Sequence, residues 1–272
     1  MASSKISVDS PVLLNYLRRW VPPRPLLKGK GRSLINFDMY RFSQLSVWCK
    51  SPMTHVEDML EWYPHALSDV EKLQARISNL ALIMSPDPEK AATAELDDFV
   101  ESLSKNVQVP LPKIHAQFQT SQTMMLTVAI FLNATLRAIE DPLDLNTKWK
   151  DQALWLTEEV FTMGETMMHL RPLYAVGLSV TIVVAWGAET DPVRRARLEH
   201  YMNLYNSAST GEDWWHGARW FEEYLARWRK EAIALLGQEE AHEDDVEVVK
   251  PDGERIYCEL ESDKPIGRCT IL

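Results

Sequence analysis

The sequence predicts an all-α fold, and three observations support that prediction. Apolar residues recur every three or four positions along several long segments, which is the period of a helix that buries one face. The 272-residue chain has only 10 glycines, few for a fold built from many tight turns. Pairs that favour helix starts precede some of these segments, such as Asp191-Pro192. We therefore expect one domain of about nine helices, with a short C-terminal β-hairpin tail.

Composition divides the chain into three parts. Residues 1–35 form a basic, proline-rich N-terminal arm, in which a short helix over 11–20 is followed by an extended segment that the prolines impose. Residues 36–237 hold the helical domain. Residues 238–272 comprise an acidic linker and the hairpin tail, where 250–253 supply a Pro-Asp-Gly turn.

The first half of the domain contains three predicted helices. The segment 36–62 carries aromatic and apolar residues that allow one buried stripe. In the segment 68–84 apolar residues recur every three or four positions, which predicts a helix. Ser68 and Glu71 form a capping-box pattern, which predicts that this helix starts at Ser68. A weaker, acidic helix is predicted over 88–105.

The second half contains five predicted helices. The first is long and apolar, and the second carries a tryptophan and methionine stripe that we expect to pack in the core. The third and fourth form a buried helix, a tight corner and an amphipathic helix. The fifth is rich in tryptophan, and Gly237 is expected to end it as a C-cap. These helices are predicted over 115–139, 146–170, 173–186, 192–205 and 212–236.

Charge and cysteine content exclude several classes of function. The formal net charge of −10 argues against general nucleic-acid affinity, because phosphate binding requires a basic surface. The three scattered cysteines, Cys49, Cys258 and Cys269, predict neither a disulfide framework nor a zinc site, and they favour a reducing compartment. The apolar runs 124–132 and 173–186 are shorter than the roughly 18 residues of a membrane-spanning helix. We therefore expect an intracellular protein of the nucleus or cytoplasm.

One acidic motif has a catalytic interpretation. The helix predicted over 88–105 contains a D-D-x-x-E pattern, and class I terpene cyclases use such a motif to hold magnesium ions on an isoprenoid diphosphate. A second metal motif is nearly matched, but its glutamate falls one residue late, which turns the side chain about 100° around a helix. A magnesium-dependent enzyme is therefore an alternative hypothesis. Its candidate ligands are Asp97, Asp98, Glu101, Asn203, Ser207 and Glu212.

The C-terminus supports a second alternative. Cys269-Thr270-Ile271-Leu272 fits the C-a-a-X pattern, and a terminal leucine favours geranylgeranylation of the cysteine. The residues 259–263 upstream are acidic, whereas one lipid usually needs a second signal such as a polybasic patch for firm anchoring. In this alternative Cys269 is the lipidation site of a peripheral membrane protein, and membrane attachment is expected only in that case.

Residues 118–205 carry a linked pattern of structural residues. An R-P-L-x-A turn is followed by an apolar helix that ends in A-W-x-A, then by D-P-x-x-R-x-x-x-E and a tyrosine. With this pattern the segment resembles the C-terminal part of the regulatory region of fungal binuclear zinc-cluster transcription factors. The matching residues are Arg171, Pro172, Leu173, Ala175, Ala185, Trp186, Ala188, Asp191, Pro192, Arg195, Glu199 and Tyr205.

The resemblance implies an all-helical regulatory domain that acts in the nucleus on a set of genes. Those factors read DNA through a cluster held by about six cysteines, and this chain has only 3. We therefore expect a non-enzymatic regulatory or co-regulator protein without a cofactor or direct DNA binding. It would act through an effector or a protein partner, with a DNA-binding subunit as one candidate. The arginines Arg194, Arg195 and Arg197 would then form a solvated helix face.

Overall fold

Helices form the body of the protein in its computed structural model. Seven α-helices account for almost all of the described residues, which confirms the predicted all-α body for that part of the chain. The predicted count of about nine helices is not confirmed, because the helices predicted over 11–20 and 88–105 lie almost entirely outside the described residues. The described residues are 39–87, 89–90, 110–167, 175–206, 214–243, 248–249 and 255–256.

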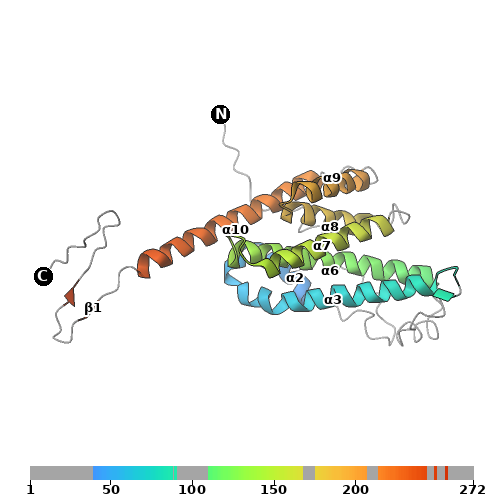
Figure 1. Cartoon of the computed structure of the whole chain (residues 1–272), viewed down its shortest axis with the longest axis horizontal. Coiled ribbons are helices and arrows are strands. Elements are labelled where there is room, and N and C mark those ends of the chain that lie inside the picture. The colour runs from blue at the N-terminus through green and yellow to red at the C-terminus, as the bar shows by residue number, and fades with distance from the viewer. Residues whose placement is uncertain are drawn as a thin grey trace.

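The helices lie side by side in one stack, and α10 runs diagonally past it and projects beyond the other helices at its C-terminal end (Figure 1). A 3-10 turn, η2 (Pro52–Thr54), stands between the first two helices. The α-helices are α2 (Met39–Trp48), α3 (Val56–Ile83), α6 (Leu111–Glu140), α7 (Thr147–Thr166), α8 (Ala175–Ala188), α9 (Pro192–Asn206) and α10 (Trp214–Glu243).

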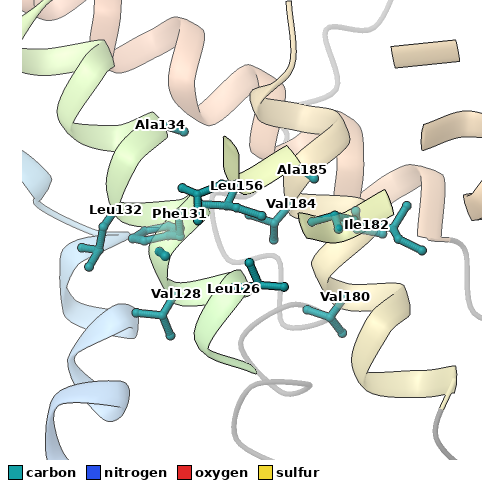
Figure 2. Close-up of a cluster of buried hydrophobic side chains, with 14 of the residues drawn as sticks. Leu126, Val128, Phe131, Leu132, Ala134, Leu156, Val180, Ile182, Val184 and Ala185 are labelled. Carbon is teal, nitrogen blue, oxygen red and sulfur yellow. The ribbon is translucent and has the colours of Figure 1, made fainter. Parts of the chain in front are cut away.

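The central helix is α6, against which α3, α7, α8 and α10 pack. Its second half is buried on every side, as is α8 from residue 177 to 187, and a helix that is apolar all round is stable only inside a protein. In Figure 2, Leu126 and Phe131 of α6, Leu156 of α7 and Val184 of α8 gather in this core. Met163 and Met167 are buried and Trp149 packs partly buried against the core, which confirms that the predicted tryptophan and methionine stripe is core packing.

Buried threonines join α6 to α8 inside this apolar contact. The Thr181 hydroxyl lies 2.9 Å from the Thr123 carbonyl oxygen and 2.8 Å from the Thr127 hydroxyl, and all three side chains are buried. Buried hydroxyls must find partners to offset their lost hydration. These hydrogen bonds therefore fix the register of the two central helices.

One described helix, Leu111–Glu140, is long and apolar enough to cross a membrane by length and composition alone. Of its most apolar window, 94% is buried within the protein. The core helix of a soluble protein passes the same test.

The predicted helix start at Ser68 is wrong, because α3 runs unbroken from Val56 through Pro64 and Ser68 to Ile83. A proline inside a helix costs about 3 kcal/mol. Buried residues continue at helical spacing on both sides of the proline, from Met59 to Val70 and beyond. The burial of that stripe outweighs the local cost of the proline and the local capping signal.

The predicted C-cap at Gly237 is also wrong, because α10 continues through it to Glu243. Part of the expected acidic linker is therefore helical. Beyond it, β1 (Val248–Val249) pairs with β2 (Arg255–Ile256) in antiparallel register, with Val248 opposite Ile256. The rest of the tail lies outside the described residues, so the hairpin as a whole stays a prediction.

Candidate functional site

The candidate site is a cavity of about 430 Å³, here called the corner cleft, between the α6–α7 side of the stack and the turn that joins α8 to α9. Its volume lies in the range of about 300–1,000 Å³ that is typical of small-molecule pockets. Three basic and three acidic side chains line it together with apolar residues. The charged residues are Arg137, Asp144, Lys150, Glu189, Asp191 and Arg194.

Arg137 stands near the end of α6 and lines the cleft from its buried side. Only 7% of the residue is exposed, although an arginine is rarely buried without full pairing. One terminal nitrogen donates a hydrogen bond of 3.2 Å to Asp144. The Nε–H group is buried and has no hydrogen-bond partner among the described residues. The Nε–H groups of Arg227 and Arg229 share this property, so what distinguishes Arg137 is its position in the lining of the cleft.

Asp144 occupies an unusual backbone position in the α6–α7 connection. Its φ of 59° is the one positive value among the described residues other than glycine, and aspartate and asparagine adopt this left-handed conformation more readily than other L-residues. The neighbouring Asp141 carboxylate holds the turn by accepting hydrogen bonds from the backbone N–H groups of Leu145 and Asn146. The turn places the Asp144 carboxylate between Arg137 and Lys150, at 3.2 Å and 3.4 Å respectively.

The floor of the cleft beside Arg137 is rigid. The buried Asn133 side-chain amide donates hydrogen bonds to the Tyr63 hydroxyl at 2.8 Å and to the Trp149 carbonyl oxygen at 3.2 Å. The Tyr63 and Trp149 rings stack with their centroids 5.4 Å apart. Burial raises the pKa of Tyr63, so its hydroxyl stays protonated at neutral pH. These contacts tie α3, α6 and α7 together under the cleft.

The opposite wall is a closed ion pair at the α8–α9 corner. Arg194 donates two hydrogen bonds to the Glu189 carboxylate, from Nε at 2.9 Å and from a terminal nitrogen at 3.2 Å. The same carboxylate accepts from the backbone N–H groups of Thr190 and Asp191. The Glu189 side chain is 7% exposed, so burial without these donors would be costly.

Asp191 caps α9 as the sequence predicts. Its carboxylate accepts hydrogen bonds of 2.9 Å from the backbone N–H groups of Val193 and Arg194. These bonds satisfy two of the donors that a helix start leaves without partners. The hydrogen bond from the Arg194 N–H is the main cause that lowers the pKa of Asp191, which favours the charged carboxylate.

The acidic and basic side chains of the corner cleft differ in how many of their hydrogen-bonding groups have partners within the protein. Each of its carboxylates accepts at least two hydrogen bonds or ion pairs from within the protein, as described above for Asp144, Glu189 and Asp191. Arg137 and Lys150 instead share a single carboxylate, although an arginine carries five N–H donors and a lysine three. The cleft can therefore donate further hydrogen bonds to a bound molecule.

Three residues of the family-like pattern, together with Glu222 of α10, meet next to the cleft. The Trp186 indole N–H donates to Glu199 at 3.1 Å, and the Arg195 guanidinium lies 3.7 Å from the centroid of the Trp186 ring. Arg195 also donates to Glu222 of α10 at 2.7 Å. We call Trp186, Arg195, Glu199 and Glu222 the corner cluster. It joins α8, α9 and α10.

The expectation that the α9 arginines form a solvated face is met only in part, because Arg197 is exposed whereas Arg194 and Arg195 are half-buried. Arg194 pairs with Glu189, and Arg195 belongs to the corner cluster. Arg197 donates to Glu165 of α7 at 2.8 Å and lies 3.9 Å from the centroid of the Phe161 ring. All three arginines therefore connect α9 to its neighbours. The amphipathic pattern showed the charge but not the carboxylates that lie opposite it.

The structure describes only part of the other predicted sites. Asn203 is exposed on α9, while the other candidate magnesium ligands Asp97, Asp98, Glu101, Ser207 and Glu212 lie outside the described residues. The lipidation candidate Cys269 and the motif residues Arg171 and Pro172 lie outside them as well. Both alternatives therefore stay predictions.

Cys49 is the buried free cysteine of the described chain, and it is 5% exposed. Burial raises the pKa of its thiol to about 12. Because the thiolate is the reactive form, this thiol is chemically inert at neutral pH. Within the described ranges, no group of three or more His, Cys, Asp or Glu side chains could hold a metal ion.

Sequence reasoning missed the principal residues of the cleft. Arg137 had a usable signal, because it is a lone cation inside a long apolar segment. Asp144 and Lys150 had none, because the backbone conformation that brings them together is not encoded in a recognisable motif. Glu189 and Arg194 lie within the family-like stretch, but that pattern does not include them.

Comparisons with protein-family models, curated proteins and solved structures found no match to this chain.

Proposed function

We propose that this chain is a non-enzymatic regulatory or co-regulator protein that acts by binding a small effector in the corner cleft and a protein partner elsewhere on its surface. The observation that carries the proposal is the cleft itself. It has the volume of a small-molecule site, and the basic side chains of Arg137 and Lys150 line it next to apolar residues.

The position of the cleft supports a regulatory role. One wall is the Glu189–Arg194 pair, and the next side chain along α9 is Arg195 of the corner cluster. An effector that contacts this wall would favour one arrangement of α8, α9 and α10 over others. A ligand shifts a conformational equilibrium only through such differential contacts. The likeness to fungal regulatory regions supports the same proposal, since it falls on this corner.

A reporter assay tests the regulatory role. The chain is fused to an unrelated DNA-binding domain, and transcription from a promoter with that domain's site is measured. We expect the wild-type fusion to change transcription and Lys150→Gln to reduce the change. Lys148→Gln, the same substitution on an exposed residue outside the cleft, should behave as wild type. Unchanged transcription with a stably expressed wild-type fusion would count against regulation.

Affinity purification from the source cell tests the partner. Mass spectrometry of proteins retained by the tagged chain should identify a DNA-binding subunit, since the chain is expected not to bind DNA itself. Repeated recovery without any DNA-binding protein would refute the co-regulator role and leave the cleft to be tested by direct ligand binding.

A further inference from the structure

We propose that the corner cleft binds a small monocarboxylate with a short apolar body, and that the ligand carboxylate takes the place beside Arg137 and Lys150 that Asp144 now holds. The inference rests on the proposed function in one respect, because it names the chemical class of the effector. It stands on the geometry of three described side chains and on the apolar wall that faces them.

Charge determines the class of ligand. Glu189 accepts hydrogen bonds on both carboxylate oxygens, from Arg194 and from the backbone N–H groups of Thr190 and Asp191, so it has little to offer a cationic ligand. Asp191 accepts its two backbone hydrogen bonds on one oxygen. Arg137 and Lys150 share the single carboxylate of Asp144, so the two cations have donor capacity that this contact does not use. Hydrogen bonds between charged groups are about twice as strong as neutral ones, so an anion gains most from these donors.

Asp144 shows that a carboxylate fits between the two cations. One of its oxygens lies 3.2 Å from Arg137, and the other lies 3.4 Å from Lys150. The Asp144 side chain is 38% exposed and that of Lys150 is 46% exposed, so their ion pair contributes little to stability. The Arg137 side chain is only 9% exposed, but it stays paired because the ligand carboxylate would replace that of Asp144. A ligand carboxylate can therefore displace it at low cost.

Apolar residues define the rest of the ligand. The lining beyond the charges comes from Ile130 of α6, Ala153, Leu154 and Leu156 of α7, and Ala188 of α8. A cavity of about 430 Å³ accommodates a chain of several carbons with its head group. The body of the ligand is therefore a short alkyl or similar apolar group, and inorganic phosphate lacks it.

Isothermal titration with four probes tests the class of ligand. Hexanoate, hexanamide and hexylamine share one carbon skeleton and differ only in the head group, and inorganic phosphate supplies an anion without a body. We expect hexanoate to bind at least tenfold more tightly than the other three. Tighter binding of hexanamide, hexylamine or phosphate would overturn the inference, as would the absence of hexanoate binding.

Two variants with opposite expected effects identify the place of binding. Lys150→Gln should weaken hexanoate binding by about tenfold, because a charge-assisted hydrogen bond is lost. Asp144→Asn should tighten it by about threefold, because the competing carboxylate is removed while asparagine still tolerates the left-handed backbone. Lys148→Gln is the matched control, with wild-type affinity.

The outcomes separate this inference from the proposed function. Weaker binding to Asp144→Asn, with a helical circular-dichroism spectrum like that of wild type, would refute the displacement. Tighter binding of hexanamide or hexylamine would refute the carboxylate and leave an effector site in place. The reporter assay uses no added ligand, so the response of the wild-type fusion bears on regulation and not on the chemical class of the ligand.

Discussion

Glu159 is a buried carboxyl group outside the corner cleft, and it is 7% exposed. It lies on α7 and accepts hydrogen bonds from the side-chain amides of Gln74 on α3 at 2.7 Å and Gln122 on α6 at 3.4 Å. Burial raises its pKa, while the Gln74 hydrogen bond opposes that effect. A single side chain therefore joins three helices and makes their packing sensitive to pH.

The pH dependence of stability should reveal this residue. Because the pKa of Glu159 is higher in the folded than in the unfolded chain, the folded state binds its proton more tightly. The contribution of Glu159 to the free energy of unfolding should therefore fall as pH rises from the ordinary glutamate pKa, about 4.3, to the raised value. Urea unfolding across that range should show a shallower pH-dependent decline for Glu159→Gln than for wild type.

The neighbouring residue provides a control for Glu159. Glu158→Gln removes an exposed carboxylate from the same helix turn, so the difference between the two variants isolates the effect of burial. If Glu159→Gln has the same pH dependence as Glu158→Gln, the pKa of Glu159 is not raised in the folded protein.

At the scale of elements, the packing of α8 against α10 depends on Gly187. A Cβ atom at this position would lie 2.9 Å from Cδ1 of the buried Phe221 and 3.0 Å from the backbone oxygen of Ala218. Contacts below about 3.0 Å require something to shift, and a ring inside a close-packed core has no room to do so. The two helices can approach this closely only with a glycine here.

Substitution of two glycines should have opposite effects on stability. Gly187→Ala should lower the free energy of unfolding by about 1–3 kcal/mol through overpacking. Gly237→Ala should raise it by about 0.5–1 kcal/mol, because nothing lies within 4 Å of its added Cβ and alanine is the better helix former. Chemical denaturation of both variants measures this contrast. A stability loss at Gly237 would show that α10 is not helical there.

Helix positions were largely predictable, and the errors have a common physical origin. The starts of α7 and α9 follow local capping by Asn146 and Asp191, so the sequence signal and the structure agree. At Ser68 and Gly237 local signals predicted boundaries where the helices continue. In α3, burial of the apolar stripe against other helices outweighs the capping-box signal at Ser68. A local sequence pattern cannot predict this burial, because it depends on the packing of distant residues. Residues 233–237 of α10 are exposed, so burial does not explain why this helix continues past Gly237.

At the scale of the whole molecule, the all-α architecture could be predicted because apolar periodicity reports burial directly. The candidate site could not be predicted, because its charged groups come from α6, the α6–α7 turn, α7 and the α8–α9 corner. Their meeting depends on tertiary packing and on the left-handed Asp144. The sequence pattern with Trp186, Asp191 and Arg195 predicted the α8–α9 corner. It did not predict the α6–α7 side of the cleft, which lies opposite that corner.

The central claim is that the cleft uses Arg137 to bind an anion. Nitrogen–proton NMR of the arginine Nε–H groups tests it directly, with the Arg137 signal assigned through its own side-chain carbons. Hexanoate, but not hexanamide, should shift the Arg137 signal saturably and leave that of Arg227 on α10 unchanged. An Arg137 signal that stays in place at saturating hexanoate, or that moves no more than Arg227, would contradict the account.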